Sequence, residues 1–147
     1  VAVTVQFKAM TTQPEWLWFK ERTHVIHCED TQGIVAYRGI ELIAAAVFDS
    51  FTVDACSVHL AVDDPLVLRH GLLEQIAYHA YVVCGRARLF GLIPDNNAKA
   101  LKLDKHIGFK EVARVPHAVS EDVGYIIMEL HKRDCRFLPE QIRKEAA

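Results

Sequence analysis

The chain has 147 residues, of which 51% are hydrophobic and 24% are charged, and its formal net charge is −2 at pH 7. This length suits one domain with a sizeable core, which we expect to span residues 1–147. A near-neutral charge without a basic block excludes nucleic acid as an expected partner, and the apolar runs are too short to span a membrane.

The first half of the chain has the pattern of a strand, a helix and three further strands. Alternating apolar residues predict a strand over residues 1–8, and Pro14, after polar capping residues, predicts a short helix that begins near it. Two strands then meet at a turn around Gly39. The second of them, residues 41–48, is apolar on both faces, as expected of a central strand. Residues 55–62 form the next predicted strand.

Helices and strands alternate in the second half. A helix is predicted from Asp64 to Gly85, and a strand follows over residues 87–93. Asn97 is placed to cap another helix, which Gly108 ends in a left-handed turn. A two-stranded hairpin and a charged tail close the chain. The inner face of the helix predicted from Asp64 to Gly85 is expected to consist of Leu72, Leu73, Ile76, Ala77, Ala80 and Tyr81. This order predicts an α/β domain on a mixed, mostly antiparallel sheet.

Cysteine and histidine usage indicates neither a disulfide scaffold nor a metal site. The four cysteines include no C-x-x-C pair, which suits the reduced thiols of a cytoplasmic protein. The densest histidine cluster lies in His24–Asp30, where two histidines could meet a metal only in a helix. The β-branched residues and the following Thr-Gln-Gly turn instead predict a strand with imidazoles in solvent. We therefore expect no metal.

The element order, together with the spacing N-x-x-A-x-x-x-x-x-x-x-G-F filled by Asn97, Ala100, Gly108 and Phe109, resembles the GNAT superfamily of acyl-CoA-dependent N-acetyltransferases. The closing run "VGYIIMELHKRDCRFL" also resembles small GNAT-like proteins encoded by bacteriophages. The resemblance implies a GNAT-like fold, with a mixed, mostly antiparallel sheet flanked by helices. It further implies direct transfer of an acetyl group from acetyl-CoA to a primary amine, with the capped helix beside the pantetheine arm.

The family binds the pyrophosphate of coenzyme A in a loop of the form Q/R-x-x-G-x-G/A, which opens the helix after the fourth strand. The aligned segment here is "LVLRHG", in which Leu66 and Arg69 depart from the pattern and Gly71 agrees. Backbone N–H groups at a helix start bind anions, so the resemblance still implies a working site. The alternative is a solvated helix end and a decayed site. The predicted cofactor contacts are Leu60, Val62, Leu68, Arg69, His70, Gly71, Leu72 and Asn97.

Many family members carry a tyrosine four residues before the G-F glycine, where it can protonate the departing thiolate. The matching residue here is Asp104. Because a carboxylate is ordinarily ionised near neutral pH, we interpret Asp104 as a surface residue that pairs with nearby lysines. Lys99, Lys102 and Lys105 form a positive stripe on the same helix, either as a solvated face or as contacts to the 3′-phosphate of coenzyme A.

Transfer to an amine requires a base, and His59 is the predicted one because it lies mid-strand and titrates near neutrality. Glu41 and Asp49, at the ends of the neighbouring strand, are weaker candidates. A backbone N–H within residues 57–62 is expected to polarise the thioester carbonyl. Cys56 points to the opposite face of the strand from His59, which disfavours a thiol nucleophile.

Two classes of function stay open. The first is an N-acetyltransferase whose acceptor is a small-molecule or peptide amine. The second is a catalytically inactive GNAT-fold binding or accessory protein of phage origin. We expect the early helix and the late hairpin to build the acceptor pocket. Trp16 and Trp18 are interpreted as an aromatic helix face packed on the sheet, with a place in the wall of the acceptor pocket as the alternative. The oligomeric state is left open, a homodimer included.

Overall fold

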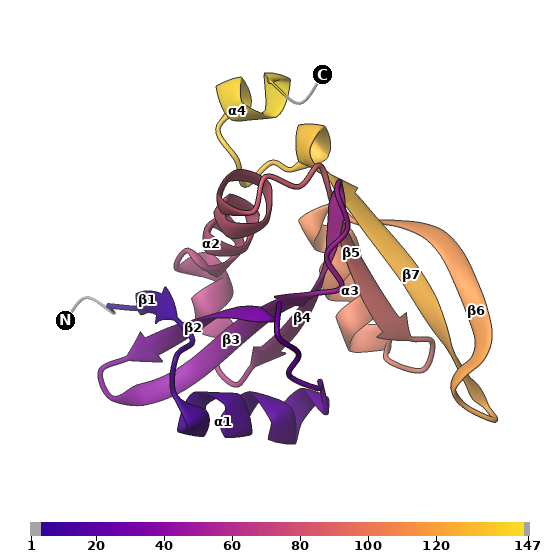
Figure 1. Cartoon of the computed structure of the whole chain (residues 1–147), viewed down its shortest axis with the longest axis horizontal. Coiled ribbons are helices and arrows are strands. Elements are labelled where there is room, and N and C mark those ends of the chain that lie inside the picture. Colours follow the sequence, from indigo (N-terminus) through magenta and orange to yellow (C-terminus); the bar gives the residue numbers. More distant parts are fainter. Residues whose placement is uncertain (1–3, 146–147) are drawn as a thin grey trace.

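In residues 4–145, which the computed structural model describes, a seven-stranded sheet carries helices on both faces (Figure 1). The strands are β1 (Gln6–Ala9), β2 (Gln32–Arg38), β3 (Glu41–Asp49), β4 (Ala55–Val62), β5 (Arg88–Pro94), β6 (Lys110–Ser120) and β7 (Val123–His131). The helices are α1 (Gln13–Thr23), α2 (Leu72–Ala77), α3 (Ala98–Ile107) and α4 (Glu140–Lys144). Two 3₁₀ segments, η1 (Pro65–Arg69) and η3 (Lys132–Asp134), and one π-helical segment, η2 (Tyr78–Val83), complete the helical part. Within this described part, no helix has the length and apolarity needed to cross a membrane.

The sheet has the order β1-β2-β3-β4-β5-β7-β6. Neighbouring strands are antiparallel, except that β4 and β5 run parallel. The prediction of an α/β fold on a mixed, mostly antiparallel sheet flanked by helices is confirmed. The strand predicted over residues 1–8 begins at Gln6 in the structure, and the first three residues of that range lie outside the described part.

The core lies on both faces of β3, because residues 43–48 are all fully buried. On one face, Phe19 of α1 packs with Val47 of β3 and Ala61 of β4. On the other face, α2 and η2 cover the sheet with the apolar side chains that the sequence predicted, all of which are buried. Alternation along β4 therefore sends His59 toward the α1 face and Leu60 toward the α2 face.

The parallel strands β4 and β5 pair over only three residues each. Residues 55–57 of β4 lie opposite residues 88–90 of β5, and no pairing follows beyond them. Strand β4 continues along β3 as far as Val62, whereas β5 continues along β7 as far as Pro94. The two halves of the sheet therefore separate, which leaves one edge of β4 without a strand partner from residue 58 onward (Figure 1).

Helix α3 is capped at both ends as predicted. The Asn97 side chain accepts a hydrogen bond from the backbone N–H of Ala100 at 3.1 Å, which satisfies a free donor of the first turn. Gly108 ends the helix at φ 118°, a left-handed conformation that favours glycine. The guanidinium of Arg136 also donates to the carbonyl of Ile107 at 3.1 Å. These caps hold the short helix at a fixed place between β5 and β6.

The helix predicted from Asp64 to Gly85 is divided. A 3₁₀ turn, η1, follows Asp64, and Gly71 then adopts φ 107° before α2 begins at Leu72. A left-handed residue cannot continue a right-handed helix, so the chain changes direction at Gly71. The remainder, α2 and η2, is one continuous helical segment that widens into π-type turns.

The strand predicted within His24–Asp30 is wrong. His24 ends α1 at φ 58°, and the next seven residues form an irregular segment with a tight turn, in which the N–H of Thr31 bonds to the carbonyl of Cys28 at 3.1 Å. The ring of His27 meets Trp16 edge-on at 4.4 Å. In the described sheet, strand pairing of this part of the chain begins only at Gln32 of β2. The β-branched residues before it therefore have no neighbouring strand that would hold them extended. Among the described residues, no group of three or more His, Cys, Asp or Glu could hold a metal ion.

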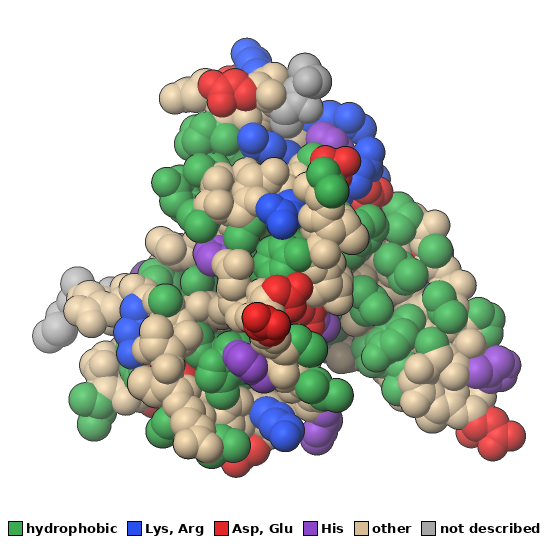
Figure 2. Space-filling view, in the orientation of Figure 1, with side chains coloured by type: hydrophobic (Ala, Val, Ile, Leu, Met, Phe, Trp, Pro, Cys, Tyr) green, Lys and Arg blue, Asp and Glu red, His purple; other side chains and the backbone are tan. Residues whose placement is uncertain are grey.

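Strand β6 forms the outer edge of the sheet, and all its residues are exposed. Figure 2 shows hydrophobic side chains gathered over the β6–β7 hairpin, and the exposed large hydrophobic residues of β6 are Val112, Val115 and Val119. Pro116 interrupts this edge and His117 adopts φ 59°. A proline lacks the N–H that strand pairing requires, so the edge is a poor template for another strand.

Candidate active site

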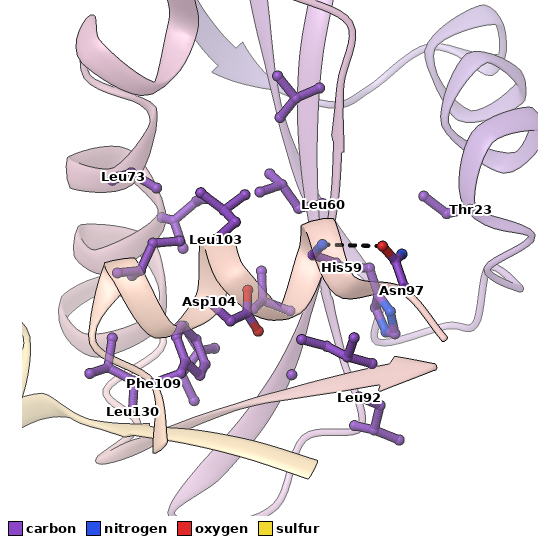
Figure 3. A pocket seen from close by; sticks show the side chains of 18 of the residues that line it. Thr23, His59, Leu60, Leu73, Leu92, Asn97, Leu103, Asp104, Phe109 and Leu130 are labelled. Atoms are coloured by element: carbon purple, nitrogen blue, oxygen red, sulfur yellow. Dashed lines mark hydrogen bonds between the residues drawn. The ribbon is translucent and has the colours of Figure 1, made fainter. Parts of the chain in front are cut away.

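A pocket of about 550 Å³ occupies the place where β4 and β5 separate. Its walls come from β4, β5, α2, η2 and α3, and the segment at the end of α1 closes one side (Figure 3). The lining includes His59 and Leu60, whose side chains point to opposite faces of the sheet. The pocket therefore reaches both faces through the gap between the strands.

His59 lies in this pocket and is hydrogen-bonded to Asp49. The ring nitrogen Nε2 of His59 is 2.8 Å from Oδ1 of Asp49, and the two side chains are 25% and 17% exposed. The pair forms because Val47 lies opposite His59 in the β3–β4 ladder, which brings Asp49, two residues further along β3, diagonally next to the ring on the same face. The sequence proposed Asp49 and His59 as competing bases, whereas the structure makes them partners.

This contact fixes which ring nitrogen is free. A carboxylate only accepts hydrogen bonds, so the neutral imidazole carries its hydrogen on Nε2 and keeps the lone pair of Nδ1 available. The other weak candidate, Glu41, lies at the far end of β3, where it is exposed and pairs with Arg38 at 3.6 Å. The arrangement can accept a proton at Nδ1 of His59 and stabilise the resulting cation through Asp49.

The interpretation of Asp104 as a surface residue paired with lysines is wrong. Its side chain lines the pocket (Figure 3), and among the described residues it forms neither an ion pair nor a side-chain hydrogen bond. Burial raises the pKa of Asp104 from 3.8 to about 6. The neighbouring strand makes room for it, since a Cβ on Gly91 of β5 would lie 2.7 Å from Oδ2 of Asp104.

The predicted cofactor contacts divide into two groups. Leu60, Val62 and Asn97 line the pocket, whereas residues 68–72 do not, although Leu73 does. The side chain of Leu72 is fully buried in the core, so only its backbone is available to a ligand. Arg69 and His70 are exposed and Leu68 is half-buried.

The helix start at Gly71 is partly covered. A Cβ at Gly71 would lie 3.3 Å from the ring of Phe7, so the β1 side chain packs directly over this glycine. The N–H groups of the first turn of α2 begin at the next residue, and a helix start leaves such donors without partners inside the helix. The backbone expected to bind an anion is thus present, with an apolar side chain on one side of it.

The early helix and the late hairpin were expected to build the acceptor pocket, but only the end of the early helix lines the pocket found here. Arg22, Thr23 and Val25 reach it from the end of α1. Residues 116–124, the part of the late hairpin expected to contribute, do not line it, although Leu130 of β7 does. Arg22 is held by two hydrogen bonds to Asp63, at 2.9 and 2.8 Å, and stacks on the ring of Trp18 at 3.8 Å. Trp16 and Trp18 are half-buried and pack against the cluster of Phe19, Val47 and Ala61 on the α1 face of the sheet. They do not line the pocket, which agrees with their interpretation as packing residues.

Sequence reasoning missed Gly91 and the location of Asp104, and it did not pair Asp49 with His59. One signal for the pair was present, because Asp49 is a carboxylate that directly follows the apolar residues 42–48 of β3. The contact of Gly91 with Asp104 joins a strand to the following helix, and no local pattern marks it.

No protein-family model matches this sequence, and no curated protein sequence matches it. Comparison with solved structures instead identifies the fold. The chain shares the fold of GNAT-family N-acetyltransferases.

The similar structures include proteins of three bacteria. A protein of Desulfovibrio desulfuricans assigned to the GNAT family superposes with a TM-score of 0.71 at 15% identity, over 87% of this chain and 99% of its own. Spermidine/spermine N-acetyltransferase SpeG of Vibrio cholerae gives 0.71 at 9% identity, over 86% and 92%. The ribosomal-protein-S18-alanine N-acetyltransferase of Escherichia coli gives 0.65 at 21% identity, over 87% and 94%. The resemblance to bacteriophage proteins stays a prediction.

Proposed function

We propose that this protein is an N-acetyltransferase that moves the acetyl group of acetyl-CoA directly to a primary amine. The observation that carries the proposal is the His59–Asp49 pair, which lies in a pocket at the gap between β4 and β5. A fold alone does not define an activity, whereas a positioned acceptor of protons in such a gap supports one.

The gap between β4 and β5 offers the pantetheine arm of an acyl-CoA both free backbone groups and an apolar wall. Beyond residue 57, the edge of β4 that faces β5 has no strand partner, so its backbone groups are available to a bound amide or carbonyl. A backbone N–H on this edge is placed to polarise the thioester carbonyl as negative charge develops on its oxygen. Leu60 and Val62 supply an apolar wall along the arm, and Asn97 fixes the start of α3 beside it.

His59 would remove the proton from the attacking amine. An aliphatic ammonium has a pKa of about 10, so it is almost wholly protonated near neutral pH and needs an acceptor before it can attack. Nδ1 of His59 takes that proton, and Asp49 stabilises the imidazolium and holds the ring in place. The amine nitrogen forms its bond to the carbonyl carbon as the carbon–sulfur bond breaks, with no covalent enzyme intermediate.

We place the pyrophosphate at residues 68–72. The first-turn N–H groups of α2 and the positive end of the helical segment favour an anion there, and Arg69 is exposed and close in sequence. Leu68, His70, Gly71 and Leu72 contribute through their backbone. Binding of the pyrophosphate at this helix start requires the ring of Phe7, which packs against Gly71, to lie beside the phosphates rather than over them.

The acceptor class is an amine of a small molecule or of a peptide. Two of the similar structures support this class, since one is named for spermidine and spermine and the other for an alanine of a ribosomal protein. The fold neighbours do not choose between the two kinds of acceptor.

One observation favours the alternative of an inactive binding or accessory protein. Phe7 packs over Gly71, the one residue of "LVLRHG" that agrees with the family loop. A protein that had lost cofactor binding would keep the capped α3 and the core but have no use for an open helix start.

Calorimetry and thermal melting with acetyl-CoA separate the two functions. An acetyltransferase binds acetyl-CoA and melts at a higher temperature at concentrations far above the dissociation constant. Mass spectrometry of polyamines, amino acids and peptides after incubation with acetyl-CoA then identifies an acetylated product. The absence of binding at millimolar acetyl-CoA would contradict the proposed function and favour the accessory protein.

A further inference from the structure

Helices cover only one face of the part of the sheet that β5, β7 and β6 form. Ile126 and Met128 of β7 are buried in the core cluster that α2 and α3 share with the sheet. The second cluster, around Phe19 of α1, takes its sheet residues from β2, β3 and β4 alone. In the described part of the chain, the opposite face of β5, β7 and β6 therefore has no helix packed on it.

This uncovered face is on the same side of the sheet as His59. Ser57 of β4 lies opposite Phe90 of β5 in the parallel ladder, and paired residues of neighbouring strands point to the same side. Alternation then places Leu92 and Pro94 of β5 on the side of Ser57 and His59. Two cross-strand rows continue outward over β7 to β6, and their six residues form what we call the open face: Leu92, Ile127 and Ala113 in one row, and Pro94, Tyr125 and Val115 in the other.

The open face is apolar, yet its residues pack in neither core cluster. Leu92 is 39% and Val115 is 44% exposed, whereas Gly91 and Ile93, which alternate with Leu92 along β5, are buried. The open face is part of the hydrophobic surface that Figure 2 shows over the β6–β7 hairpin. Contiguous apolar surface of this kind marks a place where another molecule binds.

The open face begins at the candidate active site. Leu92 and Pro94 line the same pocket as His59 (Figure 3). Neighbouring strands lie about 4.8 Å apart, so the two rows extend about 10 Å outward from β5 to β6. An extended chain rises about 3.3 Å per residue, and three such residues span this distance. A short peptide whose amine lies beside His59 therefore has the length to lie along the rows.

The charges around the pocket do not suit an acceptor with several positive groups. The carboxylates at the ends of β3, β4 and β5 are already bound: Asp49 to His59, Asp63 to Arg22, Asp64 to Arg38, and Asp95 to the N–H of Gly124. Glu129 of β7 likewise pairs with Arg88. A polyamine keeps a further ammonium group outside the reacting amine, and that group would have to displace one of these partners. An apolar chain has no such requirement.

We propose that the acceptor is the N-terminal amine of a peptide or protein whose first three residues are apolar, and that these residues lie along the open face. This inference rests on the proposed acetyltransferase function. The amine nitrogen bonds to the carbonyl carbon of acetyl-CoA and gives its proton to His59. The carbon–sulfur bond breaks, and the sulfur keeps the electron pair and takes a proton from water. The products are an acetylated N-terminus and coenzyme A, and burial of apolar side chains on the open face selects the acceptor.

Three acceptors test the selection. Two hexapeptides differ only in their first three residues, which are Leu-Val-Leu in one and Lys-Glu-Lys in the other, and spermidine is the third acceptor. We expect kcat/KM of the wild type to be at least about 10-fold higher for the Leu-Val-Leu peptide than for either of the others. Fluorescence anisotropy of the labelled Leu-Val-Leu peptide, with the protein saturated with coenzyme A, measures its binding without turnover.

Variants of the open face show whether it is the surface that selects. Ile127→Asp places a charge in the middle of one row, and we expect it to lower both the affinity for the Leu-Val-Leu peptide and its kcat/KM by at least about 10-fold. Val115→Asp, at the outer strand, is a second variant in case Ile127→Asp does not fold, which its melting temperature reveals. Leu17→Asp is the control, because Leu17 is 51% exposed on α1 and lies outside the pocket and the open face.

The outcomes separate this inference from the function on which it rests. If the wild type binds no acetyl-CoA and acetylates no amine, the proposed function fails. If the wild type is active but prefers spermidine or the Lys-Glu-Lys peptide, or if the folded open-face variants keep the wild-type preference, the inference is overturned and the function stands. A dimer in sedimentation that Ile127→Asp converts to a monomer would assign the open face to a second copy of the chain, and would also overturn the inference.

Discussion

The hydroxyl of Tyr37 on β2 donates a hydrogen bond of 2.7 Å to Oε2 of Glu15, a carboxylate that is only 2% exposed in the first turn of α1. The other carboxylate oxygen accepts from the N–H groups of Thr11 and Thr12, each at 3.0 Å, and Lys8 of β1 lies 2.9 Å from Oε2. Glu15 thus ties α1 to two strands. Because the end of α1 closes one side of the pocket, this buried group helps to position the candidate site.

Replacement of Glu15 by Gln is expected to lower the free energy of unfolding by about 2 to 4 kcal/mol, because it removes charge-assisted hydrogen bonds and leaves Lys8 without its partner. Urea unfolding at pH 7 measures the loss. Glu21→Gln, at an exposed position of the same helix, is the control and is expected to change stability by less than about 0.5 kcal/mol. Equal stability of the two variants would contradict a structural role for the buried carboxylate.

The buried carboxylate of Glu15 also makes the stability of the protein depend on pH. Burial by itself raises the pKa of Glu15, but the hydrogen bonds from Thr11, Tyr37, Lys8 and Thr12 outweigh it and lower the pKa from 4.5 to about 2. A folded-state pKa below the unfolded value stabilises the protein above the unfolded pKa, and that stabilisation is lost as pH falls. We expect the wild type to lose stability between about pH 5 and pH 2, and Glu15→Gln to lack this component. Urea midpoints across this range provide the measurement.

For catalysis, His59→Gln is expected to lower kcat by at least about 10²-fold, since Gln cannot accept the amine proton. Coenzyme A affinity should be nearly unchanged, because His59 faces the α1 side of the sheet, away from α2. The acidic limb of the pH–rate profile should flatten. His106→Gln, on the exposed side of α3, is the control. Full activity of His59→Gln would remove His59 from the mechanism, and an equal loss of cofactor affinity would make it a packing residue.

Asp49 is expected to act through His59 as a positioning residue. Asp49→Asn can present an N–H to Nε2, which favours the wrong tautomer and removes the negative charge that stabilises the imidazolium. We expect kcat to fall by about 10- to 10²-fold with KM for acetyl-CoA unchanged. A purely structural role would instead lower the melting temperature and raise KM together with the loss of kcat.

Asp104 should destabilise the folded protein at neutral pH. Its folded-state pKa of about 6 lies above its ordinary value of 3.8, so the penalty of burying the charge grows as pH rises between these values and is full above about pH 6. Asp104→Asn is therefore expected to be about 1 to 3 kcal/mol more stable than the wild type at pH 8 and of similar stability at pH 4. Urea unfolding at both pH values tests this. Lower stability of the variant at pH 8 would show that the carboxylate has a stabilising partner.

The sequence by itself determined the features that depend on near neighbours along the chain. Asn97 and Gly108 predicted both ends of α3, since each acts on donors or acceptors of the adjacent turn. Alternation along β4 predicted that His59 and Leu60 face opposite sides of the sheet. The family spacing led from these local features to the GNAT fold. Local patterns failed where a distant partner was needed, as in the segment after His24, which has no strand beside it.

Only the tertiary structure decided the chemistry of the candidate site. The pairing of His59 with Asp49 depends on the register between β3 and β4, which a shift of one residue would abolish. The protonation of Asp104 depends on how much water reaches its carboxyl group, and this is set by α3 packing against β5 at Gly91. A sequence lists titratable groups, but hydrogen bonds and burial across distant segments determine which of them share a site and which carry a proton.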